Sequence, residues 1–167
     1  MKKTAKKTVE RRIRALFARC SEPPPEVIIP ILEKAGRGEQ ELEAQVYNTE
    51  TSLYKGMMRI LRLEDKNMKT LAKLWEVTAG FYGIKFQPIE LADSRFSLSI
   101  SDCPMLHVRK DVSLNVKDRF CDVYCTAGGR ALMDTALGPQ RGTCTWDKVL
   151  IRGGKKCTLV VESVKPG

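Results

Sequence analysis

Apolar residues in the first part of the chain recur with the period of a helix. Within residues 5–20, three apolar residues follow the first at i+4, i+7 and i+8, so that all four share one side of a helix: Val9, Ile13, Leu16 and Phe17. Three consecutive prolines at 23–25 end this helix, because proline cannot continue one. A second helix is predicted at about 26–35, closed by glycines at 36 and 38.

Two longer helical patterns follow before residue 84. The first spans about 40–63, with apolar residues at three- and four-residue steps: Leu42, Val46, Leu53, Met57, Ile60 and Leu61. The second begins at Asp65 or Asn67 and ends near Gly80 and Gly83. Its predicted inner face consists of Leu71, Leu74, Trp75, Thr78 and Phe81.

At Ile84 the period changes to the two-residue alternation of strands. Residues 85–91 and 95–101 predict a hairpin, and Pro88 places the first of these strands at an edge. Residues 114–137 predict a helix that Gly138 and Pro139 end. Two strands, at about 143–151 and 156–163, complete the chain around a Gly-Gly turn.

This order predicts an α+β fold, in which a helical N-terminal half precedes a ββαββ unit with a four-stranded antiparallel sheet. The 167 residues suit one domain. We therefore expect a basic N-terminal arm or helix at 1–22 and a single α+β domain at 23–167.

Positive charge is concentrated at the N-terminus. The net charge is +9, and residues 1–20 carry +7 of it, since eight basic residues there face one acid, Glu10. This arm could attract nucleic acid, an anionic membrane surface or a partner protein, or it could be a solvated helix. Phe17 is its only ring, so base stacking is not expected. The candidate contacts are Lys2, Lys3, Lys6, Lys7, Arg11 and Arg12.

No apolar run approaches the roughly 18 residues that span a bilayer. The basic N-terminus lacks the apolar region of a secretory signal, because arginines interrupt it. We therefore expect a cytoplasmic protein whose cysteines are reduced.

Five of the six cysteines fall between residues 103 and 157. Cys121 and Cys125 are one helical turn apart and face the same way, and Cys103 and His107 have the same spacing. Together they could complete a tetrahedral zinc site. Cys157 is an alternative fourth ligand, or a ligand of an iron–sulfur cluster, which is the less favoured of the two cofactors.

Two other interpretations of these thiols stay open. They could pack as small buried hydrophobic groups. Alternatively, His107, the only histidine, could lower the pKa of Cys103 or Cys121 and create a nucleophile. The candidate catalytic residues are then Cys103, His107 and Cys121.

Several short motifs support a family resemblance over about residues 85–163. They are Cys103-Pro104, Phe120-Cys121-x3-Cys125, Gly138-Pro139 and Gly153-Gly154-x2-Cys157-x-Leu159. This pattern resembles the L-2-amino-thiazoline-4-carboxylic acid hydrolase-like proteins. More distantly, it resembles the 4-vinyl reductase-type small-ligand-binding domains related to trafficking-particle subunits.

The resemblance implies a sensor or hydrolase-like domain with a ligand pocket between helices and sheet, cysteine-linked zinc and a homodimer. The cysteines that it carries over are Cys103, Cys121, Cys125 and Cys157. Where such zinc sensors carry a glutamate and a further cysteine, this chain has Trp146 and Val149.

The sequence therefore favours a small-ligand-binding domain with a cysteine-lined site that could hold a metal. One alternative is a cysteine-dependent hydrolase that acts on a thiazoline-like or related C–N or C–S bond. A second alternative is nucleic-acid or partner binding through the basic arm.

Overall fold

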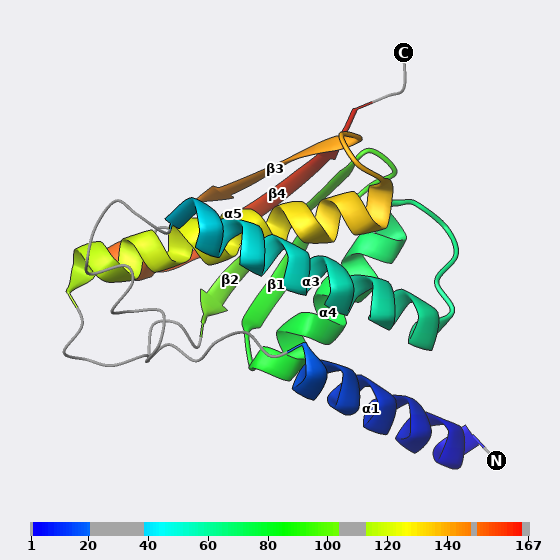
Figure 1. Cartoon of the computed structure of the whole chain (residues 1–167). Coiled ribbons are helices and arrows are strands. Elements are labelled where there is room, and N and C mark those ends of the chain that lie inside the picture. The colour runs from blue at the N-terminus through cyan, green and yellow to red at the C-terminus, as the bar shows by residue number, and fades with distance from the viewer. Residues whose placement is uncertain (1, 21–38, 104–112, 148–149, 165–167) are drawn as a thin grey trace.

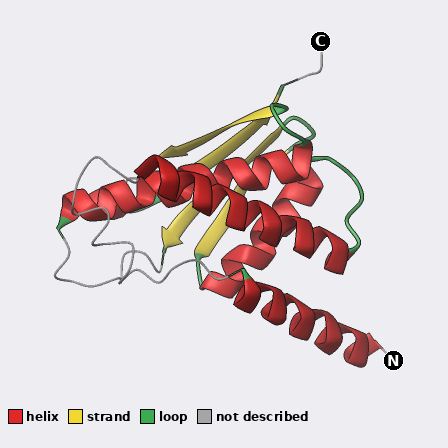
Figure 2. Cartoon of the chain, in the orientation of Figure 1, coloured by secondary structure: helices red, strands yellow, loops and turns green. Residues whose placement is uncertain are grey.

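The computed structural model describes residues 2–20, 39–103, 113–147 and 150–164. Four helices lie on one face of a four-stranded sheet (Figures 1 and 2). The helices are α1 (Lys2–Arg19), α3 (Glu39–Leu61), α4 (Met68–Tyr82) and α5 (Leu114–Leu137). The strands are β1 (Lys85–Leu91), β2 (Arg95–Asp102), β3 (Gly142–Asp147) and β4 (Cys157–Ser163). The predicted α+β class and the ββαββ order are confirmed.

The strands pair antiparallel in the order β1-β2-β4-β3. Leu159 of β4 lies opposite Leu98 on one side and opposite Trp146 on the other, and Phe96 lies opposite Val161. Of these five side chains, only Trp146 is not fully buried. Alternation along the strands therefore places one apolar face of the sheet beneath the helices.

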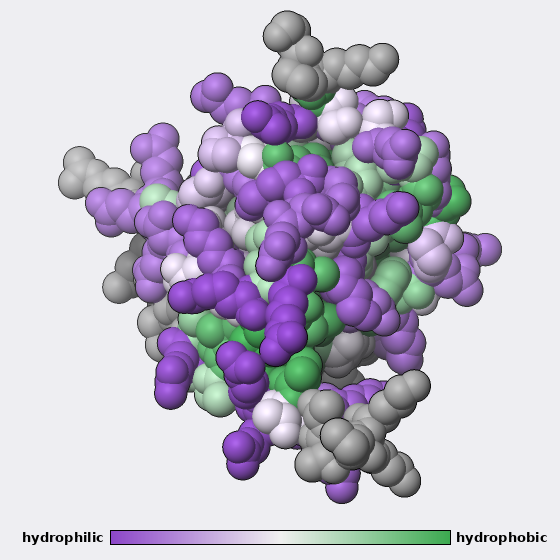
Figure 3. Space-filling view, turned by 90° about the vertical axis from the view of Figure 1, so that its right-hand side faces the viewer, coloured by the Kyte–Doolittle hydropathy of each residue, from purple (hydrophilic) through white to green (hydrophobic). Residues whose placement is uncertain are grey.

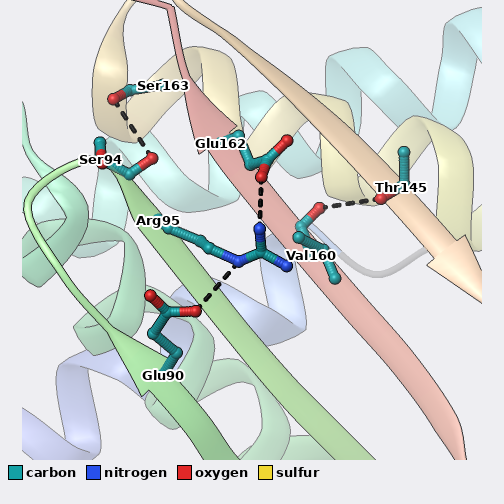
Figure 4. Close-up of polar contacts among 7 residues, drawn as sticks. All are labelled: Glu90, Ser94, Arg95, Thr145, Val160, Glu162 and Ser163. Carbon is teal, nitrogen blue, oxygen red and sulfur yellow. Dashed lines mark hydrogen bonds and ion pairs between the residues drawn. The ribbon is translucent and has the colours of Figure 1, made fainter.

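The opposite face of the sheet is polar. Arg95 of β2 forms an ion pair with Glu90 of β1 at 3.0 Å and another with Glu162 of β4 at 2.6 Å (Figure 4). These side chains are about half exposed, so each pair stabilises the fold by at most about 1 kcal/mol. Arg95 nevertheless ties three neighbouring strands together on the side that no described helix covers.

Strand β1 is an edge, as Pro88 predicted. Its pairing with β2 shifts register twice, once near Lys85 and once between Pro88 and Glu90. Ile89, in the second irregularity, is 62% exposed. Proline supplies no N–H to a sheet ladder, so this stretch of the edge is interrupted.

Short-range hydrogen bonds set the helix boundaries. The side chain of Asn67 accepts a hydrogen bond from the backbone N–H of Thr70 at 2.9 Å, so Asn67 rather than Asp65 caps α4. Gly83, with a φ of 72°, ends that helix in the left-handed region that favours glycine. Ser113 caps α5 in the same way as Asn67 caps α4.

The third strand is shorter than predicted. It ends at Asp147, and Leu150–Arg152 form a turn of 3-10 helix. There the backbone N–H of Leu150 donates to the Sγ of Cys157 at 3.3 Å, which holds the chain in the turn instead of the ladder. The helix expected at 26–35 and the turn expected at 104–110 lie outside the described residues.

Helix α5 approaches the sheet closely at Gly129. A Cβ atom at this position would lie 2.6 Å from Nε1 of Trp146 and 2.8 Å from Sγ of Cys144, both on β3. At neighbouring Gly128, a Cβ would meet only the Cγ of Glu50, at 3.9 Å. The two adjacent glycines therefore have different roles: one permits contact with the sheet, and the other borders open space.

This contrast predicts that adding one methyl group has opposite effects on stability at Gly129 and at Gly128. Gly129→Ala should lower the free energy of unfolding by about 1–3 kcal/mol, because the added carbon overpacks the contact with β3. Gly128→Ala should leave it unchanged or raise it by up to about 1 kcal/mol, because alanine favours helix. Urea unfolding of both variants is the measurement. Equal stability of the two would contradict this account.

Candidate functional site

A cavity of about 160 Å³ lies between the helices and the sheet. Helix α3 contributes Tyr54 to its wall, α4 contributes Trp75 and Tyr82, and β2 contributes Ile100. The lining is almost wholly apolar. Cavities of this kind, with a few polar groups, are the usual sites for small ligands.

Helix α5 leaves room for the cavity because Gly128 and Gly129 line it without side chains. Gly129 touches the sheet, as described above, whereas Gly128 borders the space in front of Glu50. The sequence analysis did not assign a role to this pair. Two adjacent glycines inside a predicted helix nevertheless indicate a special position. Glycine weakens a helix, so its presence there suggests that a close contact or an open space requires the absence of a side chain.

Glu50 lines the cavity from α3 and is only 5% exposed. The sequence analysis did not single it out. It stands four residues after Val46 and three before Leu53, on the buried side of the helix, where the apolar pattern has a gap. A charged residue in such a gap is the signal that could have identified it, because burying a carboxylate is costly without a partner.

Trp75 supplies a second polar group to the cavity wall. Its side chain is 5% exposed, and its indole N–H is buried without a hydrogen-bond partner among the described residues. Leaving a buried donor unsatisfied is unfavourable, so a ligand acceptor that reached this N–H would gain a hydrogen bond. Trp146, from β3, also lines the cavity, so both tryptophans of the chain border it.

Two of the predicted site cysteines, Cys103 and Cys125, line the cavity. A hydrogen bond with Cys121 and then burial raise the pKa of the Cys125 thiol well above its usual range. The charges of Cys121, Cys103 and Cys157 raise this pKa further. Cys121, Cys103 and Cys157 are therefore close enough to Cys125 to raise its pKa, and Cys125 is a neutral thiol near pH 7.

Cys144 on β3 and Cys157 on β4 are also held as neutral thiols. Burial raises the pKa of Cys157, against the opposing effect of its hydrogen bond from Leu150. Burial likewise raises the pKa of Cys144 to about 12, although a hydrogen bond with Trp146 acts in the other direction.

The structure leaves the metal and catalytic assignments as predictions. Among the residues that the structure describes, no three or more His, Cys, Asp or Glu side chains are grouped as a metal site requires. His107, needed for the predicted Cys3His set and for the predicted nucleophile, lies outside those residues. The spacing of Cys121 and Cys125 on one helix face, in contrast, is confirmed.

The basic residues of the N-terminus lie on α1, away from the cavity wall. Lys6, Lys7, Arg11 and Arg12 are exposed. The side chains of Lys2 and Lys3 are outside the described part. In residues 2–20, 39–103, 113–147 and 150–164, no helix is long and apolar enough to cross a membrane.

Comparison with known proteins identifies the fold. No family model and no curated protein sequence matches the chain. A crystal structure of trafficking protein particle complex subunit 3 from Naegleria fowleri, covalently bound to palmitic acid, is similar over 96% of this chain and 97% of that one. The TM-score is 0.61 at 14% identity.

A second structure, the H-NOX domain from Shewanella oneidensis in its Fe(II)CO state, covers 74% of this chain and 66% of its own. Its TM-score is 0.41 at 12% identity, too low to carry an argument. The chain thus has the fold of a trafficking-particle subunit, as the more distant part of the resemblance implied. The hydrolase-like family is not confirmed.

The raised pKa values predict slow thiol modification. At pH 8 a pKa of about 12 in place of 9.0 leaves Cys144 with about 1000-fold less thiolate, which is the reactive form. Iodoacetamide should therefore label Cys144 far more slowly than it labels a model peptide, as followed by mass spectrometry. Unfolding in urea should remove the difference. Labelling at the peptide rate in the folded protein would show that this thiol is not protected.

Proposed function

We propose that this protein is a small-ligand-binding domain whose ligand occupies the cavity between α3, α4, α5 and the sheet. The observation that carries the proposal is an apolar cavity whose lining includes a few buried polar groups, among them Glu50 and the indole N–H of Trp75. Apolar walls supply affinity, and a few polar groups orient the ligand. The similar trafficking-particle subunit, which holds palmitic acid, supports a ligand of apolar character.

The cavity limits the size of the ligand. A volume of about 160 Å³ is close to that of an engineered protein cavity of about 150 Å³ that binds benzene. A compact apolar group of about six to eight non-hydrogen atoms fits such a space. A palmitoyl chain is much longer, so it would require the cavity to open. We therefore propose a short acyl, alkyl or aromatic ligand with one polar group near Glu50 and Trp75.

A second candidate function is covalent binding of the ligand, with Cys103 as the residue to which it is attached. Cys103 lines the cavity, whereas the thiol of Cys125 is held neutral by its high pKa. Transfer of an acyl group from an activated thioester to the Cys103 thiolate would break the donor's C–S bond, release the donor thiolate and form a new thioester. The apolar part of the acyl group would then stay inside the cavity. The hydrolase activity and the homodimer that the resemblance implied stay predictions.

Binding can be measured through the two tryptophans, because both border the cavity. Titration with toluene or hexanol should change the tryptophan fluorescence and saturate. Gly128→Leu should abolish this response, because its side chain would fill the space in front of Glu50.

Gly80→Leu is the matched control for that experiment. Gly80 also lies in a helix, and a Cβ there would meet nothing within 4 Å. It does not line the cavity, so the variant should bind as the parent does. Equal binding by Gly128→Leu and Gly80→Leu would sink the proposal, as would the absence of a saturable response in the parent protein.

Zinc at the cysteines is a separate proposal, based on the three thiols that raise the pKa of Cys125. Protein purified without oxygen should contain about one equivalent of zinc, and Cys103→Ser should lower this content, whereas Cys20→Ser should not. Cys20 is the control because it lies just beyond α1, outside the group. A zinc content below about 0.1 equivalent would exclude such a site, since structural zinc binds tightly.

A further inference from the structure

The outward side of α1 is cationic. Lys7, Arg11 and Arg14 follow one another at i, i+4 and i+7, so they form one stripe along the helix, and all three are exposed. The opposite side of α1 faces the body, where Phe17 is 3% exposed and Leu16 lies against Gly56 of α3. This packing holds the stripe on the outside of the molecule.

The stripe is not neutralised within the described residues. None of Lys7, Arg11 and Arg14 forms an ion pair with a described residue. The first turn of α1 contains no acid, although acids there would favour the helix dipole. Lys7 and Arg11 also repel each other, as like charges at i, i+4 do. An anionic partner would neutralise these positive charges and so reduce the repulsion between Lys7 and Arg11.

Exposed aromatic rings lie beside this helix. Phe81 of α4 stacks on Phe17 of α1 with ring centroids 3.7 Å apart, and Phe81 is 46% exposed. Tyr82, 36% exposed, contacts both rings edge-on, at 5.6 and 5.5 Å. Figure 3, which views the molecule from the side toward which the N-terminal end of α1 points, shows a mainly hydrophilic surface with smaller hydrophobic areas.

Tyr82 also lines the cavity. The aromatic group of Phe17, Phe81 and Tyr82 therefore connects the surface beside α1 with the ligand space. The exposed aromatic surface beside α1 and the ligand space share one side chain, Tyr82.

We infer that the face formed by α1 and the end of α4 docks on an anionic lipid bilayer, from which the ligand enters the cavity beside Tyr82. The inference rests on the proposed function. Basic residues near an anionic bilayer each contribute attraction, and aromatic side chains favour the headgroup region. Nucleic acid fits less well, because one face of the Phe81 ring is already covered by Phe17, which leaves few rings for base stacking.

Vesicle flotation with the full-length chain tests this inference. The protein should bind vesicles of phosphatidylcholine with 30% phosphatidylserine (about one lipid in three), and not vesicles of phosphatidylcholine alone. Substituting Lys7→Gln, Arg11→Gln and Arg14→Gln together should weaken binding about 100-fold, given the usual contribution of a basic residue at such a surface. Phe81→Ser should weaken it further.

The matched control is the triple variant Lys69→Gln, Lys155→Gln and Lys156→Gln. These residues are exposed and removing them removes the same charge. Lys69 is in the first turn of α4, at the opposite end from Phe81, and Lys155 and Lys156 precede β4, so binding should change less than about threefold. Equal losses in the two triple variants would overturn the inference, because net charge alone would then explain binding. Binding of a single-stranded RNA but not of anionic vesicles would also overturn it, in favour of nucleic acid.

The two proposals can fail separately. The tryptophan response to toluene reports the cavity, and the α1 triple variant should retain it. If vesicles do not bind but toluene does, the membrane inference is wrong and the proposed function stands. If toluene does not bind to any form of the protein, the proposed function is wrong whatever the vesicles show.

Discussion

The contact of α5 with β3 at Gly129 is the constraint on which the rest of the structure depends. There is no space for a single carbon atom between the helix and the side chains of Trp146 and Cys144. Helix α5 is thereby held against one end of the sheet, and α3 and α4 pack beside it. The cavity is the space that these three helices do not fill, and Gly128 keeps it from being filled by α5.

The chemistry of the cavity follows from its apolar lining. Burial and mutual hydrogen bonding hold the thiols that have raised pKa values, Cys125, Cys144 and Cys157, in their neutral forms. Neutral thiols behave as small hydrophobic groups, so Cys125, the one of these three that lines the cavity, extends its apolar wall. Against this background, Glu50 and the indole N–H of Trp75 are the polar groups most able to distinguish one ligand from another.

Much of the fold was predictable because the periodicity is strong. The hairpin at 85–101 and the helix at 114–137 follow from alternation and from helical spacing, and both are confirmed. The end of β3 was not predictable, because the hydrogen bond from Leu150 to Cys157 forms only once β4 returns beside β3, and the local strand pattern does not show it. The site was predictable only in part. The cysteines were identified from spacing, whereas Glu50 and Gly128 acquire their roles from the neighbours that folding brings to them.

The interrupted edge at β1 has a consequence for how copies of this chain can associate. An open antiparallel sheet with a regular edge can recruit the same edge of another molecule and extend without limit. Pro88 and the neighbouring register shift remove the continuous ladder that such extension needs. At this edge a second copy must therefore recognise side chains and not a continuous backbone ladder. The limit does not extend to β3, which forms the other edge of the sheet.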